Sequence, residues 1–163
     1  MIIVVAGVSG TGESSVGKAL SEHFNLPFLD ADDFHPAQNI AKMQSGSALT
    51  DKDRWPWLTT LAEALTKHHQ EKGAVLACSA LKESYRALLS ANYTLPIIWI
   101  TLTGSARLLE ARLSARQSHF FDGRLLQTQL ATFEAPNYGI QIDVADPLDK
   151  VVAQAASYIK QHA

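Results

Sequence analysis

The fold is decided by residues 7–15, which read GVSGTGESS and directly follow the apolar run IIVVA at residues 2–6. The spacing of Gly7, Gly12 and Ser14 matches the phosphate-binding loop G-x-x-x-x-G-K-[ST], which joins a strand to a helix. Glycines are needed in such a loop because backbone N–H groups must approach phosphate oxygens closely. The helix that follows directs the positive end of its dipole at the anion. The stretch therefore predicts a nucleotide-binding α/β domain.

We expect this loop to hold the phosphates of ATP together with a magnesium ion. Ser14 stands where the motif has the hydroxyl that coordinates Mg²⁺. The residues expected to contact the nucleotide are Gly7, Ser9, Gly10, Thr11, Gly12, Ser14 and Ser15. The alternative is a glycine-rich turn that binds no ligand.

Glu13 occupies the position at which the motif has lysine. A cation that would bridge the β- and γ-phosphates at the catalytic centre is thereby replaced by an anion. At about 4 Å and an effective dielectric constant near 20, a pair of unit charges contributes roughly 4 kcal/mol. A penalty of about 4 kcal/mol corresponds to a loss on the order of a thousandfold in rate. Lys18 lies on the next turn and on a different helix face, so it is a poor substitute, and we expect strongly impaired transfer.

The composition predicts one domain over residues 1–163. A chain of 163 residues and 17.8 kDa has the size of a single domain, and its 47% hydrophobic content is sufficient for a packed core. The formal net charge of −2 gives no electrostatic reason to expect a nucleic acid or an anionic membrane as partner. The single cysteine, Cys78, excludes an intramolecular disulfide, and no apolar run approaches the roughly 20 residues of a membrane span. We expect a soluble cytoplasmic protein.

Short apolar runs alternate with helical patterns along the chain. This alternation is typical of a parallel sheet that helices cover on both faces. The runs predicted as strands are residues 2–6, 27–30, 74–78, 96–102 and 140–144. Each run is bounded by Gly, Pro, Asn or Asp, as buried strands often are.

Apolar residues at helical spacing predict two amphipathic helices, one around residues 58–65 and one around residues 148–159. We expect Thr50 to cap the first helix. For the second helix we expect Asp146 as the cap and Pro147 at the first helical position.

Acidic residues follow the second predicted strand at Asp30, Asp32 and Asp33. Ligands of an open parallel sheet gather at the carboxyl ends of its strands, so these side chains are expected to face the phosphate loop. One carboxylate can hold Mg²⁺, and another can accept the proton of an attacking hydroxyl. We expect such functions of Asp30 and Asp32, and a solvated turn or a helix cap for Asp33.

Several further segments combine into a recognisable pattern. They are GVSG at 7–10, D-x-D-x-x-H-P at 30–36, NI at 39–40, KM at 42–43, LTDKDR at 49–54, WL at 57–58, CSALK at 78–82, YR at 85–86, RL at 112–113 and HFF at 119–121, with Gly46, Arg116, Gln129 and FE at 133–134. With these segments the sequence resembles the gluconate kinases (gluconokinases), phosphate-loop small kinases related to shikimate kinase. The likeness covers nearly the whole chain, and several segments are more specific than the loop itself.

The resemblance implies a fold and a reaction. The fold is a five-stranded parallel sheet of order 2-3-1-4-5 with a mobile lid, which we expect at about residues 114–134. The reaction is phosphoryl transfer from ATP to the terminal hydroxyl of D-gluconate, giving 6-phosphogluconate, in a homodimer. The likeness to related kinases places Asp30 with Ser14 on the Mg²⁺ side and Asp32 on the substrate hydroxyl.

The same resemblance suggests residues for the sugar acid. Arg54 and Lys82 are expected to bind its carboxylate and hydroxyls, with His35 and Arg86 beside them. A guanidinium group suits this role because it binds a carboxylate in bidentate geometry.

The resemblance also suggests residues for the nucleotide and the lid. Arg112 and Arg116 share a helical face and are expected to contact the nucleotide. Arg116 could also neutralise charge on the transferred group, and His119 in the lid is expected to touch the substrate.

Structural roles stay open for some of these residues. Arg112 could pair with Glu110 or face solvent, and HFF at 119–121 could be a hydrophobic anchor of the lid. Trp55 and Trp57 are interpreted as packing residues, and Cys78 as packing at a strand end.

Two other functions stay open as well. The chain could be a non-catalytic protein that keeps the kinase fold and binds gluconate or a nucleotide. It could also be a kinase for another small hydroxy acid.

Overall fold

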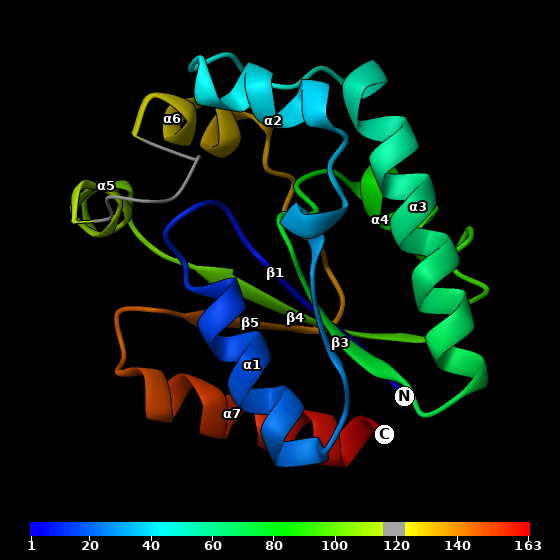
Figure 1. Cartoon of the computed structure of the whole chain (residues 1–163). Helices are drawn as coiled ribbons and strands as arrows, with labels where there is room; N and C mark the ends of the chain where they lie inside the picture. The colour runs from blue at the N-terminus through cyan, green and yellow to red at the C-terminus, as the bar shows by residue number, and fades with distance from the viewer. Residues whose placement is uncertain (116–122) are drawn as a thin grey trace.

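Five parallel strands form the centre of the computed structural model, which describes residues 1–115 and 123–163, without the side chains of residues 123–125. Their order across the sheet is β2-β3-β1-β4-β5 (Figure 1). The strands are β1 Ile2–Ala6, β2 Phe28–Asp30, β3 Ala74–Cys78, β4 Ile97–Thr103 and β5 Ile140–Asp143. The predicted order is confirmed, and each predicted strand is present with ends shifted by at most one residue.

The middle strand β1 pairs in parallel with both β3 and β4. Ile2 lies opposite Ala74 on one side and Ile97 on the other. Every residue of β1 and β3 is buried, because the sheet is covered on both faces. These strands therefore form the rigid centre from which the loops of the site extend.

Helices cover both faces of the sheet, as predicted. α1 (Glu13–Phe24) and α7 (Leu148–His162) lie beside each other on one face, while α3 (Asp51–Gln70) and α4 (Glu83–Leu89) pack together on the other (Figure 1). The structure also describes η1 (Ala31–Phe34), α2 (Ala37–Gln44), α5 (Ala106–Ser114) and α6 (Gly123–Thr132). Within the described ranges, none of the helices has the length and apolar character needed to cross a membrane.

The start of α3 is as predicted, whereas that of α7 is not. Thr50 Oγ1 accepts the N–H of Asp53 at 3.2 Å, and Asp53 Oδ2 accepts the N–H of Thr50 at 2.8 Å, which forms a capping box. At α7 the cap residue is Pro147, whose ψ of 154° is extended and lies outside the helix. Asp146 therefore precedes the cap, and its carboxylate accepts a hydrogen bond from Gln154 at 3.4 Å.

The carboxyl ends of the strands all lie at one edge of the sheet because the strands are parallel. The glycine loop leaves this edge after β1, the acidic segment after β2 and Ser79 after β3. α2 and α6 extend beyond the edge, at the top of Figure 1. The glycine loop, the acidic segment and Ser79 thus lie together at this edge, on the side where α2 and α6 extend.

Candidate active site

The loop between β1 and α1 has the backbone shape of an anion cradle. Gly10 and Gly12 have φ angles of 90° and 87°, in the left-handed region that favours glycine. At Gly7 a Cβ atom would lie only 2.5 Å from Thr11 Oγ1, so a side chain would push the loop apart. Gly12 is the N-cap residue of α1, and it makes no side-chain cap hydrogen bond there. Gly12 has no side chain that could cap the helix, and backbone N–H groups at such a helix N-terminus are suited to an anion.

Ser14 and Asp30 connect the glycine loop to the second strand. Ser14 Oγ donates to Asp30 Oδ2 at 3.2 Å, and Asp30 Oδ1 accepts the N–H of Asp32 at 3.0 Å. A hydroxyl and a carboxylate are the hard oxygen ligands that Mg²⁺ prefers, so this pair fits a magnesium ion. The structure thus brings together the two residues predicted as its ligands.

Three carboxylates lie near the end of β3. Burial raises the pKa of the Cys78 thiol, and the charges of Asp32, Glu13 and Asp30 raise it further. A thiol with a raised pKa is a poor nucleophile, so the interpretation of Cys78 as a packing residue is in keeping with its burial. Asp33, by contrast, is exposed in η1, as expected for a solvated turn.

Glu13 is the first residue of α1, and its side chain is turned toward the loop. Thr11 Oγ1 donates to Glu13 Oε2 at 2.9 Å. An acidic side chain in the first turn is favourable for the helix dipole, whereas it repels a phosphate at the same end. Lys18 is exposed and lies 5.8 Å from the centre of the Phe28 ring. The Lys18 side chain thus lies beside Phe28 of β2.

One pocket, with a volume of about 370 Å³, opens beside the glycine loop. Its lining residues are Gly10, Thr11, Gly12, Ser15, Val16, Arg112, Ala115, Val144, Asp146, Leu148 and Val151. Arg112 donates to the carbonyl of Val144 at 2.7 Å and to that of Gly10 at 3.4 Å. Arg112 therefore braces the loop against the end of β5, rather than pairing with Glu110. We call this the nucleotide pocket.

A second, narrower pocket lies between α2, α3 and α6. Its lining residues are His35, Met43, Ala48, Leu49, Arg54, Trp57, Ser79, Leu81, Thr128 and Gln129. His35 and Arg54, two of the predicted substrate residues, line it, whereas Lys82 and Arg86 do not. We call this the acceptor pocket.

His35 is neutral in the acceptor pocket. Its ring stacks on Trp57 with centroids 4.0 Å apart, and burial, with the charge of Arg54, lowers its pKa to about 4. Asn39 Nδ2 donates to the carbonyl of Asp53 at 3.0 Å and lies 3.3 Å from His35 Nδ1. Because an amide nitrogen is a donor, Nδ1 accepts and the ring proton is on Nε2. His35 can therefore offer one N–H to a ligand.

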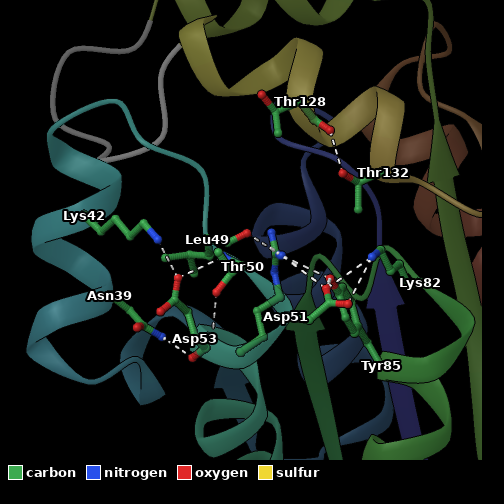
Figure 2. Close-up of polar contacts among 11 residues, drawn as sticks. Asn39, Lys42, Leu49, Thr50, Asp51, Asp53, Lys82, Tyr85, Thr128 and Thr132 are labelled. Carbon is green, nitrogen blue, oxygen red and sulfur yellow. Dashed lines mark hydrogen bonds and ion pairs between the residues drawn. The ribbon is translucent and has the colours of Figure 1, made fainter.

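Asp51 organises the two cations predicted for the sugar acid (Figure 2). Its carboxylate accepts from Lys82 Nζ at 3.2 Å and from the Tyr85 hydroxyl at 2.5 Å, and both interactions lower the pKa of Asp51. Arg54 donates to the carbonyl of Leu49 at 2.7 Å and to Tyr85 at 3.0 Å. The guanidinium of Arg54 is 4.0 Å from Asp51. Arg54 and Lys82 are thus held on either side of one carboxylate.

A second ion pair fixes α2 to the start of α3 (Figure 2). Lys42 Nζ donates to Asp53 Oδ2 at 2.7 Å. This bond, with those from Thr50, lowers the pKa of Asp53 to about 2. Because Asp53 also accepts from the backbone of Thr50, the pair joins the capping box to the α2 wall of the acceptor pocket.

Arg86 has a structural position, and the expectation that it contacts the substrate does not fit its burial. The residue is 1% exposed. It donates to the carbonyls of Ala80 at 2.8 Å and Glu134 at 2.6 Å, and its Nε lies 2.9 Å from Glu83. A buried guanidinium with its donors occupied in this way ties α4 to the chain after β3 and after α6.

Two predicted site residues, Arg116 and His119, lie outside the described residues. Of the segment expected as a lid, the structure describes the start and α6, and its mobility stays a prediction. Sequence reasoning missed the roles of Asp51, Tyr85 and Gln129. Their presence in the segments of the family pattern was the one available signal, because their contacts come from distant parts of the chain.

Comparison with known proteins identifies the family of this chain. The profile of the shikimate kinase family matches residues 9–157. The chain is 40% identical to the thermoresistant gluconokinase of Escherichia coli over 166 residues, which cover 98% of this chain and 94% of the relative.

Solved structures agree with that finding. A gluconokinase from Sinorhizobium meliloti superposes with a TM-score of 0.88 at 42% identity, over 99% of this chain and 93% of the other. An unliganded sugar kinase from Janibacter superposes with a TM-score of 0.91 at 38% identity, over 97% and 93% of the two chains. The fold is therefore shared with a gluconokinase and a sugar kinase.

Proposed function

The chain belongs to the gluconokinase family, and on that premise we propose that it is an ATP-dependent gluconokinase that forms 6-phospho-D-gluconate. The observation that supports this most is that the glycine loop lines one pocket and is hydrogen-bonded, through Ser9, to Gln129 in the lining of the second. Phosphoryl transfer needs a donor and an acceptor held on either side of the transferred group. The family adds the expectation of a cytoplasmic homodimer, which sedimentation analysis tests.

On the donor side, the glycine loop and the N-terminus of α1 would bind the phosphates of ATP through backbone N–H groups. Arg112 lines the nucleotide pocket beside the loop that it braces. Ser14 and Asp30 would hold Mg²⁺, which neutralises charge on the phosphates when it is bound.

On the acceptor side, the sugar acid would lie in the acceptor pocket. Arg54 is positioned to bind its carboxylate, and the Nε2 proton of neutral His35 can be donated to a hydroxyl. Lys82 would contribute through its shared carboxylate partner Asp51. In this arrangement the terminal hydroxyl of the sugar acid would face the phosphate loop.

Asp32 would accept the proton of that hydroxyl as the new bond forms. The hydroxyl oxygen attacks the γ-phosphorus, the bond from phosphorus to the bridging oxygen breaks, and ADP leaves with the electron pair. Asp32 follows Asp30, which accepts the N–H of Asp32, so the metal and base positions would be linked through the backbone. A general base of this kind contributes on the order of a hundredfold or more to the rate.

Glu13 would slow this reaction, because its carboxylate stands at the end of α1 where phosphate charge must be stabilised. The second candidate function, a non-catalytic binding protein, is favoured by this one residue alone. The chain would then bind gluconate or ATP without converting them.

A coupled assay with ATP, Mg²⁺ and D-gluconate, run beside calorimetric titration of each ligand, distinguishes the two. We expect gluconate-dependent ADP formation, slow but well above the rate without gluconate. Binding of both ligands without ADP formation would support the binding protein. A panel of other hydroxy acids in the same assay tests the choice of gluconate, and higher turnover of another acid would contradict it.

A further inference from the structure

Gln129 contacts both halves of the site. Its Oε1 accepts the backbone N–H of Ser9 in the glycine loop at 2.7 Å, across 120 positions of sequence. The residue is 7% exposed and lines the acceptor pocket from α6. A side chain of the acceptor pocket is thus bonded directly to the loop that borders the nucleotide pocket.

The hydrogen bond to Ser9 fixes the orientation of the Gln129 carboxamide. Because a backbone N–H is a donor, the atom facing it must be the carbonyl oxygen, and the NH₂ group points to the other side of the planar amide. Within residues 1–115 and 123–163, Nε2 forms no hydrogen bond. Among the described residues, every fully buried side-chain nitrogen or oxygen has a hydrogen-bond partner. Because Nε2 has none, this atom must be exposed to solvent. The acceptor pocket is the hollow that this side chain lines.

We propose that Gln129 is a substrate-binding residue of the gluconokinase reaction, which donates from Nε2 to a hydroxyl of the sugar acid while its Oε1 holds the Ser9 N–H. The proposal rests on the function proposed above. The Gln129 carboxamide would then connect a sugar acid bound in the acceptor pocket to the glycine loop. Its chemistry suits a polyhydroxylated acceptor, whose hydroxyl oxygens accept hydrogen bonds.

Two variants test the roles of the Gln129 carbonyl oxygen and of its NH₂ group separately. Gln129→Glu keeps an oxygen for the Ser9 N–H but removes the donor, whereas Gln129→Met removes both with little change in size. Gln127 supplies the matched control, because it lies on the same helix, is exposed and bonds to Glu110 at 3.0 Å. Gln127→Glu and Gln127→Met should leave the kinetic constants within about twofold.

We expect both Gln129 variants to raise the KM for gluconate about tenfold, as for a lost substrate hydrogen bond. Only Gln129→Met should also lower kcat, since it alone frees the loop amide. The uncharged Met variant shows whether a rise in KM comes from the lost donor rather than from added charge. A KM for gluconate within twofold of the parent in Gln129→Met would overturn the proposal.

Hydrogen exchange of the Ser9 amide tests the loop contact without any assay. Exchange should accelerate in Gln129→Met and stay slow in Gln129→Glu, in the protein without ligands. Equal exchange in Gln129→Met and the parent would overturn the contact itself. If the parent neither binds nor phosphorylates gluconate while Ser9 exchange behaves as expected, the proposed function fails and the donor role fails with it, whereas the contact stands.

Discussion

The N-termini of α1 and α3 are capped in opposite ways. α1 follows Gly12, which is in a left-handed conformation and makes no side-chain cap hydrogen bond. α3 follows Thr50, which forms a reciprocal capping box with Asp53. One helix end is therefore open to an anion, whereas the other is closed by its own chain and supports the acceptor pocket.

At the N-terminus of α1, we expect Glu13 to have opposite effects on the stability of the helix and on the binding of a phosphate. An acidic residue in the first turn of a helix contributes about 0.3–1 kcal/mol to stability. The same charge opposes a phosphate that would bind there by roughly 4 kcal/mol. We therefore expect Glu13 to favour the free protein over its nucleotide complex.

The largest expected effect comes from Glu13→Lys. We expect kcat/KM for ATP to rise about a thousandfold, because a repulsion is replaced by an attraction at the open helix end. The free energy of unfolding should fall by about 0.5 kcal/mol, because a cation is unfavourable in the first turn. Steady-state kinetics and urea denaturation measure the two effects.

Glu13→Gln is the matched control, since it removes the repulsion without adding a cation and should give an intermediate rate. An unchanged rate in Glu13→Lys would show that the open end of α1 is not where phosphate charge is stabilised.

The next effect concerns Asp32, which lies in η1 directly after β2. In the Glu13→Lys background, Asp32→Asn should lower kcat about a hundredfold, because the base for the hydroxyl proton is lost. Affinity for ATP should change less than twofold in calorimetry. The exposed neighbour Asp33 provides the control, and Asp33→Asn should leave kcat unchanged. A large loss of ATP affinity in Asp32→Asn would instead move Asp32 to the metal.

On the closed side, the stability should depend on pH through His35. Its pKa is lowered from 6.5 to about 4 in the folded protein, so between these values the unfolded chain binds a proton that the folded chain does not. This stability is therefore complete above pH 6.5 and falls by about 3 kcal/mol as the pH drops toward 4. Urea unfolding across this pH range should show a slope that His35→Gln flattens. The exposed His69 is the control, and a slope unaltered by His35→Gln would contradict the assignment.

The smallest effect is expected at the capping box. Thr50→Ala should lower the free energy of unfolding by about 1 kcal/mol, because the Asp53 N–H loses its partner. Thr66→Ala on the same helix is the control, since its hydroxyl is exposed and bonds only to the carbonyl of Ala62. A loss as large in the Thr66 variant would mean that the box adds nothing beyond helix propensity.

The sequence was sufficient to predict the fold and the place of the glycine loop in it. Hydrophobic runs located every strand to within one residue, because burial on both faces of a parallel sheet requires continuous apolar segments. The glycine spacing located the open end of α1, since its geometry depends on neighbouring residues alone. Ser14 and Asp30 lie within hydrogen-bonding distance of each other, because parallel strands end at the same edge, whereas their role as metal ligands stays a prediction.

The positions of several other side chains depend on contacts between distant residues, which local sequence spacing does not predict. Arg86 was expected at the substrate, yet its partners after β3 and after α6 bury it. The Asp51 cluster joins α3 to α4 over 31 and 34 positions, and Gln129 reaches Ser9 over 120. Side-chain roles of this kind follow from packing, so a sequence predicts the residue types and not their partners.

The central claim is that the open end of α1, and not the closed end of α3, receives the phosphates. Amide NMR during titration with ATP and Mg²⁺ measures this directly, in the parent chain and in Glu13→Lys. We predict the largest shifts at Gly10 to Ser14, at lower ATP concentration in the variant, with little change at Asp51 to Asp53. Shifts that spare the glycine loop, or that are largest at the start of α3, would contradict the account.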